Sequence, residues 1–457
     1  SQSDKQPCSA DINLGSFDVL VAGAGIGGVS ASLAAARAGA RVLLVEAEEE
    51  VGGTGVHSPV ALVCTFRDHD DRPINAGLHR EYFPTLYDNP SPRDRNPAQE
   101  WFGPRLECYD HRELLKSYQR LIAAESNLTV WTSCRVSAVR QKDGEIEAVR
   151  LEGAQAGWVR AQVFVDSTAD GNLSALAGAE FQLGRESDRA LQPSTLTFGM
   201  TDINFGGKPP MTWPEMDAFN RELTKYLHAA IAAGEVHVLK KEIFGIPYPD
   251  GRGLQFNTTR MLGVDPTRPE TVAAARKEGE RQVNEIIGVL RRHPAFAEAK
   301  LDFVGTKLGV REGRRIMGDY VLTAEDCLRP ARFDDMVAAC AYMLDIHNPT
   351  GSGTRIEQIP APGYYHIPYR CLIARGHTNL LLGSRCISGT HEAHSSYRVM
   401  GPLSAIGQAA GVAAALTAQG AKSNVRAIPA SAIRWVLREQ GQFVEGHCSP
   451  PSFRCDG

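Results

Sequence analysis

The sequence predicts an α/β fold in which a discontinuous domain, built on a parallel sheet, carries an inserted α+β domain. Three observations in this chain of 457 residues predict it. A short apolar strand and a glycine-rich turn lead into an alanine-rich helix at residues 17–39, and similar strand–turn–helix patterns follow at 161–181 and 377–416. Strands that alternate with helices favour a parallel sheet. The long segment between the second and third patterns must form a further domain.

The first element is the turn in VLVAGAGIGG, where Gly23, Gly25 and Gly28 match G-x-G-x-x-G. In this pattern the first glycine permits a tight turn, the second lets the backbone approach a diphosphate, and the third lets the helix pack on the strand. The helix N-terminus then offers free N–H groups to the anion. A membrane span explains this uncharged stretch less well, because its glycines would weaken the helix.

The second element is the strand RVLLVE, which ends at Glu46. An acid at this distance from the glycines accepts hydrogen bonds from a ribose. The turn, the helix, the second strand and the acid together predict a Rossmann-type fold that binds a dinucleotide.

The continuation VEAEEEVGGTG puts Gly52 and Gly53 directly after this acid-ended strand. It resembles flavin-dependent oxidoreductases of the glutathione-reductase/fumarate-reductase type and, within them, the FAD-dependent oxidoreductase family. The resemblance covers nearly the whole chain and implies bound FAD. His57 follows the glycine pair and is a candidate for covalent attachment, but its surroundings match covalent flavoproteins poorly. We therefore expect non-covalent FAD.

The resemblance assigns later segments to the same cofactor. In the segment 161–181, the strand AQVFVDST ends at Thr168, beside the dinucleotide in this class, although the class usually has a glycine where Ala169 stands. Val136 lies where backbone groups meet the adenine edge in this class. Gly383 and Arg385 follow a buried strand, and a glycine followed closely by an arginine is common at this place in the resembled family.

An uncharged, alanine-rich helix that starts at Gly401-Pro402 closes the predicted site. In related flavoproteins such a helix points at the flavin ring, and its positive end would stabilise reduced flavin. The predicted FAD contacts are Gly23, Gly25, Ile26, Gly27, Gly28, Glu46, Ala47, Gly53, Thr54, Val136, Thr168, Gly383, Arg385, Gly401, Pro402 and Leu403.

These assignments make the FAD-binding domain discontinuous. The predicted segments are 16–66, 104–190 and 368–440 for the FAD-binding domain, 191–367 for the inserted substrate or cap domain, 67–103 for a surface insertion and 441–457 for a tail. Within the inserted domain, apolar residues recur with helical spacing near 216–231 and 283–290, which is typical of helices that pack on a core.

Histidines and arginines near the domain junction are the candidates for chemistry, since the flavin itself carries hydride chemistry. His394 and Arg398 resemble the His-x-x-x-Arg of fumarate reductases, where the arginine holds a substrate carboxylate. An arginine fork suits a carboxylate, and imidazole titrates near neutral pH. His391, His347 and His366 are further candidates for proton transfer, and Arg311, Arg314, Arg315 and Tyr320 for substrate binding. Each of these side chains could instead have a purely structural role, in an ion pair or as a hydrogen-bonded residue of the core.

Two absences narrow the predicted reaction. No pair of redox cysteines lies beside GGTG, which argues against a disulfide reductase, and no second G-x-G-x-x-G in a strand–turn–helix setting supports a built-in NAD(P)H domain. We therefore expect hydride transfer between a small polar substrate and flavin N5, with an external acceptor such as oxygen, a quinone or another protein. A redox-neutral flavoprotein of the hydratase or isomerase type, and a non-catalytic flavin-binding protein, stay open as alternatives.

The composition of the chain limits the kinds of partner that we expect it to bind. A net charge of -4 favours neither nucleic acid nor an anionic membrane surface, and neither uncharged stretch is a good membrane span. The cysteines lack metal-binding spacings, so we expect no metal, and they favour a reducing compartment such as the cytoplasm. The printed chain starts at Ser1, so export after removal of a leader stays open, as does the oligomeric state, including a homodimer.

Overall fold

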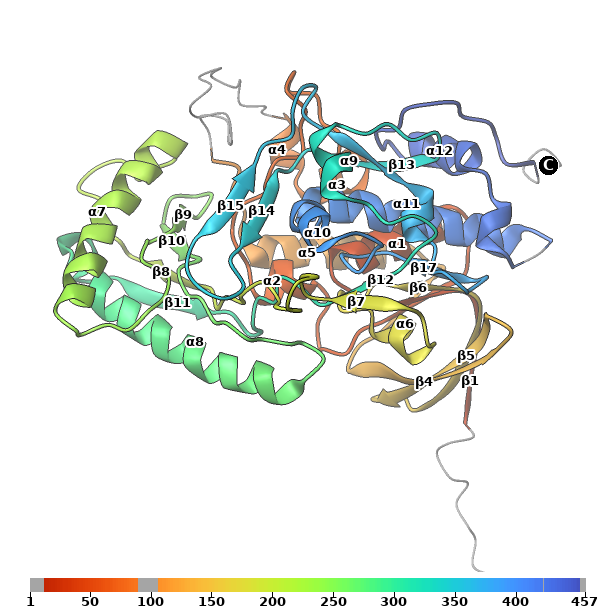
Figure 1. Cartoon of the computed structure of the whole chain (residues 1–457), viewed down its shortest axis with the longest axis horizontal. Helices are drawn as coiled ribbons and strands as arrows, with labels where there is room; N and C mark the ends of the chain where they lie inside the picture. The colour runs from red at the N-terminus through yellow and green to blue at the C-terminus, as the bar shows by residue number, and fades with distance from the viewer. Residues whose placement is uncertain (1–11, 89–105, 422, 453–457) are drawn as a thin grey trace, which may run out of the picture.

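The computed structural model describes residues 12–88, 106–421 and 423–452 (Figure 1). Its largest sheet has seven strands in the order β3-β2-β1-β6-β5-β4, with β17 also paired to β6. The strands are β1 (Asn13–Ala22), β2 (Val42–Val45), β3 (Leu128–Trp131), β4 (Cys134–Lys142), β5 (Glu145–Gly153), β6 (Gly157–Asp166) and β17 (Leu380–Leu382). Because β3, β2, β1, β6 and β17 are parallel, the predicted α/β class is confirmed.

The strand β6 explains how the C-terminal part of the chain returns to the first domain. Its first residues pair antiparallel with β5, from Gly157 to Arg160. Its last residues, Phe164 to Asp166, pair parallel with β17. One strand thus has two successive partners on the same edge, and the segment after β17 arrives next to the glycine-rich turn.

Helices α1 (Ile26–Arg37) and α11 (Met400–Gln419) pack directly against each other on this sheet. Every residue of α11 from Gly401 to Thr417 is buried. Small residues allow such close approach because they keep the two backbones free of intervening side chains. The other helices around this core are α2 (Gly53–His57), α3 (Leu78–Tyr82), α4 (Pro84–Asp88), α5 (His111–Ala123), α6 (Asn172–Leu176), α10 (His391–Tyr397), η5 (Val425–Ala427) and α12 (Ala430–Glu439).

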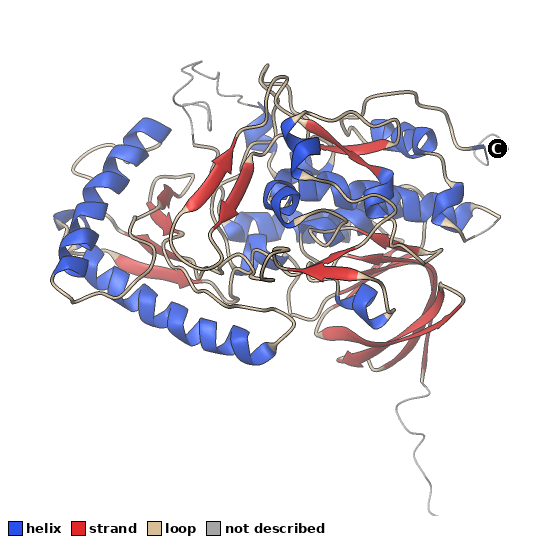
Figure 2. Ribbon diagram, viewed as in Figure 1, coloured by secondary structure: helices blue, strands red, loops and turns tan. Residues whose placement is uncertain are grey.

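A second core lies in the inserted segment, on the left in Figure 2. A sheet in the order β11-β8-β10-β9 packs there with two long helices. Met216, Leu223 and Leu227 of the first helix and Val283 and Ile286 of the second are buried, as the helical spacing predicts. The elements are β8 (Phe198–Thr201), α7 (Trp213–Ala232), β9 (Gly245–Pro247), β10 (Gly253–Phe256), α8 (Pro269–Leu290), η3 (Pro294–Phe296) and β11 (Lys300–Val304).

The later part of the inserted segment packs on the first core instead. Ile316, Val337 and Tyr365 belong to the same apolar cluster as the parallel sheet. Three short sheets connect this region, pairing β12 with β7, β13 with β16 and β14 with β15. The elements are β7 (Phe181–Leu183), β12 (Arg314–Ile316), α9 (Ala324–Leu328), β13 (Met336–Cys340), β14 (Leu344–His347), β15 (Thr354–Glu357), β16 (Tyr365–Pro368) and η4 (Tyr369–Leu372).

The segment expected to be a surface insertion contributes to the interior. Within its described part, 67–88, the side chains of Leu78, His79 and Tyr82 are buried, and α3 contacts α11. Residues 89–103 of the same prediction lie outside the described residues. The predicted tail also packs inward, because the Gln442 amide donates to Gln408 of α11 at 2.9 Å.

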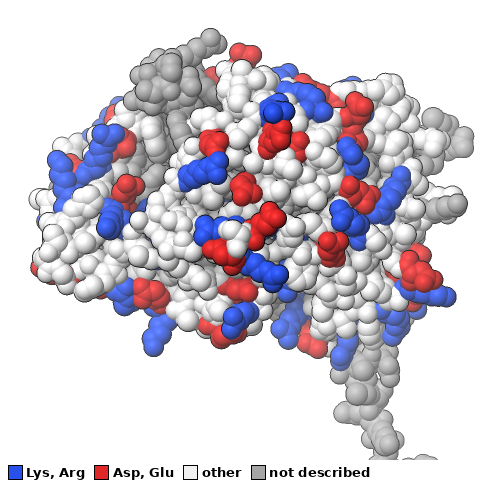
Figure 3. Space-filling model, viewed as in Figure 1, with Lys and Arg blue, Asp and Glu red and all other residues white. Residues whose placement is uncertain are grey.

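Figure 3 shows basic and acidic side chains interspersed over one face of the molecule. Within the described ranges, no single helix is long and apolar enough to cross a bilayer. Helices α10 and α11 pass that test only as a pair, and they are bent by 95° where they meet.

Candidate functional site

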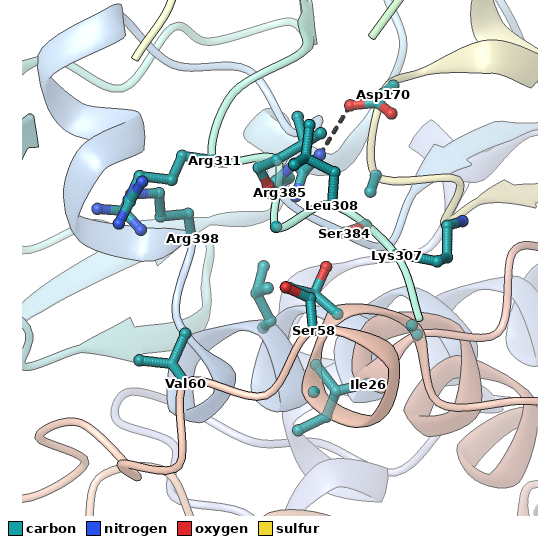
Figure 4. Close-up of a pocket in the computed structure, with 18 of the residues that line it drawn as sticks. Ile26, Ser58, Val60, Asp170, Lys307, Leu308, Arg311, Ser384, Arg385 and Arg398 are labelled. Atoms are coloured by element: carbon teal, nitrogen blue, oxygen red, sulfur yellow. Dashed lines mark hydrogen bonds and ion pairs between the residues drawn. The ribbon is translucent and has the colours of Figure 1, made fainter. Parts of the chain in front are cut away.

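A cavity of about 1630 Å³ runs between the glycine-rich turn and the inserted segment. Its walls come from the ends of β1, β2 and β6, from the start of α11, and from residues between 195 and 356. Figure 4 shows a part of this cavity, with Ile26 on one side and Arg311 and Arg398 on another. Parallel strands that end at one edge of a sheet commonly form such a site.

The glycine-rich turn leaves room for a ligand at the start of α1. A Cβ on Gly23, which has φ +94°, would lie 2.4 Å from the carbonyl oxygen of Ser167, so this position requires glycine. A Cβ on Gly25 would meet only the Cα of Gly53, at 3.7 Å, and would project into the cavity. Because α1 has no side-chain N-cap, its first N–H groups are free to bind an anion there.

Glu46 lies where β2 ends and lines the same cavity. One carboxylate oxygen accepts from the backbone N–H of Ala24 at 2.7 Å, and the other accepts from that of Glu48 at 2.9 Å. An ionised carboxylate has about four lone-pair directions, so each oxygen can accept a further hydrogen bond from a ribose hydroxyl. Val136 lines the cavity near this end, as the resemblance implies for the adenine.

Arg385 fixes another wall of the cavity. Its guanidinium donates to the Asp170 carboxylate at 2.7 Å, the dashed line in Figure 4, and to the Val310 carbonyl at 2.6 Å. The Thr168 hydroxyl donates to Asp166 at 2.6 Å. The two Arg385 bonds join the segment after β6, the segment after β17 and the inserted segment.

The start of α11 faces the cavity with Met400 and Leu403. Its N-cap, Val399, makes no side-chain cap, so free N–H groups remain at this helix end as at α1. Of the predicted FAD contacts, twelve line the cavity: Gly23, Gly25, Ile26, Gly27, Glu46, Ala47, Gly53, Thr54, Val136, Thr168, Arg385 and Leu403. Gly28, Gly383, Gly401 and Pro402 are not among the residues that line it.

Gly28 and Gly383 lie beneath the residues that line the cavity and allow those residues to pack closely. A Cβ on Gly28 would lie 1.7 Å from the Gly23 carbonyl oxygen, and one on Gly383 would lie 2.6 Å from Ser167 Oγ. Gly28 is therefore required for packing, and a side chain at Gly383 would displace the Ser167 hydroxyl, which donates to the Gly383 carbonyl. The donor set and the open cradle together fit a dinucleotide with a diphosphate at α1 and a ribose at Glu46.

Arg398 and Arg311, two of the predicted substrate residues, lie together at the substrate end of the cavity (Figure 4), whereas Arg314 lines the cavity beside Asp170. Arg398 Nη2 donates to the Asp345 carbonyl at 3.1 Å and lies 3.2 Å from its carboxylate. Arg311 donates to the Pro193 carbonyl at 2.6 Å. Arg314 is bound to the Asn172 side chain at 2.9 Å, which directs it toward α6.

His347 is the predicted proton-transfer histidine that lines this end of the cavity. Its Nε2 lies 3.5 Å from Asp345 Oδ1. Burial, together with the nearby charge of Arg311, lowers the pKa of His347 to about 3, so the imidazole is neutral at ordinary pH. Burial alone would raise the pKa of Asp345, but His347 and Arg398 lower it well below its usual range.

The other predicted histidines lie away from the cavity lining. His391 is buried and bound to Glu312 at 2.7 Å, and burial lowers the pKa of His394 well below its usual value. Both belong to the short helix α10, which packs against α9 and β14. His366 contacts Glu445 at 2.6 Å, near the C-terminal segment. The spacing of residues in the sequence did not indicate that the side chains of His391, His394 and His366 face away from the cavity.

Arg315 and Tyr320 are also placed in structural contacts. Arg315 is only 2% exposed and donates to Glu312 at 2.7 Å, so it is held within the core. The Tyr320 hydroxyl donates to Asp326 at 2.9 Å. His57, considered for covalent attachment, contacts Thr306 and the Glu50 carbonyl, each at 3.1 Å, and does not line the cavity.

The structure adds residues that the sequence did not single out. Lys240, Arg260, Tyr342 and Asp345 line the substrate end. The only local signal was Asp345, two residues before His347, since basic residues outside a motif usually belong to the solvated surface. In the part of the chain that the structure describes, no group of three or more His, Cys, Asp or Glu side chains could hold a metal ion.

Comparisons with known proteins extend this description. The model of a family described as "FAD dependent oxidoreductase" matches residues 18–437. No curated protein sequence gives a significant match. Among solved structures, the chain is similar to a geranylgeranyl bacteriochlorophyll reductase-like protein from Thermoplasma acidophilum, with 11% identity, 93% of this chain and 84% of that chain covered, and a TM-score of 0.41.

Two further solved structures are similar. For anhydrotetracycline hydroxylase from Streptomyces rimosus the identity is 13%, with 93% of this chain and 68% of that chain covered and a TM-score of 0.43. For p-nitrophenol 4-monooxygenase from Pseudomonas putida the identity is 14%, with 67% of this chain and 70% of that chain covered and a TM-score of 0.36.

Proposed function

Because the chain belongs to the FAD dependent oxidoreductase family, we propose that it transfers a hydride between a small polar substrate and FAD, with an external electron acceptor. Bound FAD supplies the hydride chemistry at its ring. The absence of a second glycine-rich dinucleotide motif in the sequence supports an acceptor outside the chain. Oxygen, a quinone or another protein can take that role.

The observation that carries this proposal is the position of Arg398 in the same cavity as the glycine-rich turn. Arg398 is the C-cap of α10, and α11 begins two residues later. The start of α11 is expected at the flavin ring, so a substrate held by Arg398 would lie beside that ring. Its Nη2 already contacts Asp345, whereas its Nη1 makes no hydrogen bond with the described residues. A carboxylate or similar anion can accept from that nitrogen.

His347 is the group we assign to proton transfer. It is neutral, so it can accept a proton, and the negative charge of a bound substrate would raise its low pKa and make it a stronger base. Asp345 lies 3.5 Å from its Nε2 and would stabilise the imidazolium that forms. Arg398 and His347 both contact Asp345, so one carboxylate orients the anchor and the base together.

Apolar side chains complete the proposed reaction space. Val60, Leu62 and Met343 line the cavity near these charged groups. Such walls exclude water, which strengthens the interactions of the arginine and the carboxylate. They also leave room for a small carbon skeleton between the anchor and the cofactor.

The test is anaerobic mixing of the FAD-loaded protein with a panel of small polar metabolites. Bleaching of the visible flavin band identifies the substrate, and re-oxidation by oxygen or by a quinone identifies the acceptor. Arg398→Ala should then lower kcat/KM by about 10- to 150-fold while FAD remains bound, since a charged hydrogen bond contributes about 1.5–3 kcal/mol. The surface variant Arg329→Ala, whose partner is Glu325, is the matched control.

Two results would overturn the proposal. One is an FAD-loaded protein whose visible band no metabolite in the panel bleaches. The other is an Arg398→Ala variant that turns over an identified substrate at the wild-type rate with flavin bound.

A further inference from the structure

Four cationic side chains meet at the substrate end of the cavity. Lys240, Arg260, Arg311 and Arg398 come from separate segments, and all four line the cavity. Of the acidic residues in that lining, Asp345 is the carboxylate that contacts one of them. The arrangement therefore concentrates positive charge around one space.

The arginines of this cationic cluster have few acceptors. Arg260 is 5% exposed, donates to the Gly353 carbonyl at 2.8 Å and leaves its Nε without a partner in the described ranges. Arg311 donates to the Pro193 carbonyl, not to a carboxylate. A buried charge is costly unless an opposite charge and hydrogen bonds compensate it. Carbonyl acceptors satisfy some N–H groups but do not neutralise the charge.

The pKa values report the same excess of positive charge. Burial, followed by the charge of Arg398, lowers the pKa of Arg311 to about 9. Burial, followed by Arg311 and Arg260, lowers the pKa of Lys240 to about 7. Asp345 raises both pKa values, but it does not cancel the lowering by burial and by the neighbouring positive charges.

The cluster lies apart from the place expected for the FAD diphosphate. That diphosphate is expected at the start of α1, where the glycines and free N–H groups lie. In Figure 4, Arg311 and Arg398 lie together on one side of the cavity, with Ile26, Lys307 and Asp170 elsewhere around it. The cations are thus available to a second ligand.

We propose that the cationic cluster binds a substrate with at least two negative charges, either a dicarboxylate or a phosphate-bearing compound. The inference rests on the proposed function in taking this ligand as the substrate. Planar guanidinium groups bind both carboxylate and phosphate oxygens through paired hydrogen bonds. A single carboxylate would leave part of the cluster uncompensated, because Asp345 is shared among these cations. A dianion compensates two of them at once.

The test measures binding without turnover. The FAD-loaded protein is titrated with acetate, succinate and inorganic phosphate at pH 7.5 and constant ionic strength, and both the shift of the bound flavin spectrum and the thermal unfolding midpoint are followed. We expect succinate, phosphate or both to bind at least about tenfold more tightly than acetate, because two charges engage two cations. Comparing the affinities for succinate and for phosphate distinguishes a dicarboxylate site from a phosphate site.

Variants identify the residues. Arg311→Met should weaken binding of the dianion at least about tenfold, and Arg311→Lys should weaken it less, since the charge remains. FAD content should not change in either variant. Arg329→Met, on the surface, is the control and should bind as wild type does.

Equal affinity for acetate and both dianions would overturn the inference, as would an Arg311→Met variant that keeps FAD and binds dianions as tightly as wild type. These results are independent of flavin bleaching. Tight dianion binding without any substrate that bleaches the flavin would refute the proposed hydride transfer and leave the anion site intact.

Discussion

Gly407 of α11 lies against Gly27 of α1 with no room for a side chain between them. A Cβ on Gly407 would lie 2.1 Å from the Gly27 carbonyl oxygen, and a Cβ on Gly411, one turn later, would lie 2.0 Å from that of Ala31. The start of α1 is the expected diphosphate site, and the start of α11 is expected at the flavin ring. Close packing of the two helices therefore sets the distance between the two ends of the cofactor site.

Gly407→Ala should destabilise the protein and weaken FAD binding. The added methyl meets backbone atoms, which cannot move aside as a flexible side chain can, so we expect a loss of about 1–3 kcal/mol or more in the free energy of unfolding. Gly288→Ala is the matched control, since it is also a helical glycine but nothing lies within 4 Å of its added Cβ. That variant should gain about 0.5–1 kcal/mol. Urea unfolding with equal losses in both variants would contradict this reading of the interface.

Glu46→Gln should lower the affinity for FAD about tenfold to a hundredfold. The amide has one accepting oxygen, so it cannot accept from both backbone N–H groups. It also lacks the negative charge that strengthens hydrogen bonds from the ribose hydroxyls, and we expect the two losses to weaken FAD binding by about 1.5–3 kcal/mol in total. Glu49→Gln, at an exposed position on the same segment, should bind FAD as wild type does. Titration of apoprotein by quenching of FAD fluorescence measures both. Equal affinities in the two variants would remove Glu46 from the predicted FAD contacts.

The sequence predicted the parallel sheet and the glycine turn because both are encoded locally. Strand, turn, helix and terminal acid lie within about 30 residues, where the pattern itself carries the reason for each residue type. It did not predict that the described part of 67–103 packs inside. There Leu78 and Tyr82 are too few, and too widely separated by polar residues, to distinguish a buried short helix from a loop.

The substrate end could be predicted only in part. Arg398 stood out through its His-x-x-x-Arg pattern and His347 through its place near the domain junction, but Lys240 and Arg260 belong to no motif and meet Arg311 only through tertiary packing. For the short helix α10, spacing alone could not tell whether His391 faces the cavity or Glu312. In the structure it contacts Glu312.

Acid should destabilise the protein through His79. Its ring is buried among Phe66, Phe83 and Tyr87, and burial lowers its pKa from 6.5 to about 3. Above pH 6.5 the histidine is neutral in both states. Below that value the unfolded chain takes up a proton that the folded chain does not, so stability falls as pH falls toward 3, by up to about 1.4 kcal/mol per pH unit.

The variant His79→Phe isolates this contribution. It keeps an aromatic ring in the cluster but cannot titrate, and it loses the 2.5 Å contact between His79 Nδ1 and the Tyr87 hydroxyl. We expect lower stability than wild type at pH 7.5 and a shallower decline between pH 6.5 and 4.5, measured by urea unfolding at several pH values. Parallel curves for the two proteins would show that the acid sensitivity arises elsewhere.

Asp345→Asn should reduce turnover while flavin binding is retained. The carboxylate accepts from the Tyr342 hydroxyl at 2.9 Å and contacts both Arg398 and His347, so its charge orients the anchor and stabilises a protonated imidazole. Loss of assisted proton transfer lowers rates by about 100-fold or more. We expect kcat to fall by that order once a substrate is identified. Asp217→Asn, which removes a surface pair with Arg221 on α7, is the control and should leave kcat unchanged.

The affinity of the cationic cluster for a dianion should increase as pH falls through about 7, because Lys240 then becomes charged. Burial and the charges of Arg311 and Arg260 lower its pKa to about 7, whereas Glu242 and Asp345 oppose that shift, and His347 stays neutral in this range. Sulfate is the suitable probe, since its own charge is constant. Between pH 8.5 and 6 its affinity should rise by at most about tenfold per pH unit, the limit for uptake of one proton. Lys240→Met should flatten this dependence, and Lys240→Arg should keep sulfate affinity high throughout, because a guanidinium stays charged. If wild type and Lys240→Met give the same pH dependence, the titrating group is not Lys240.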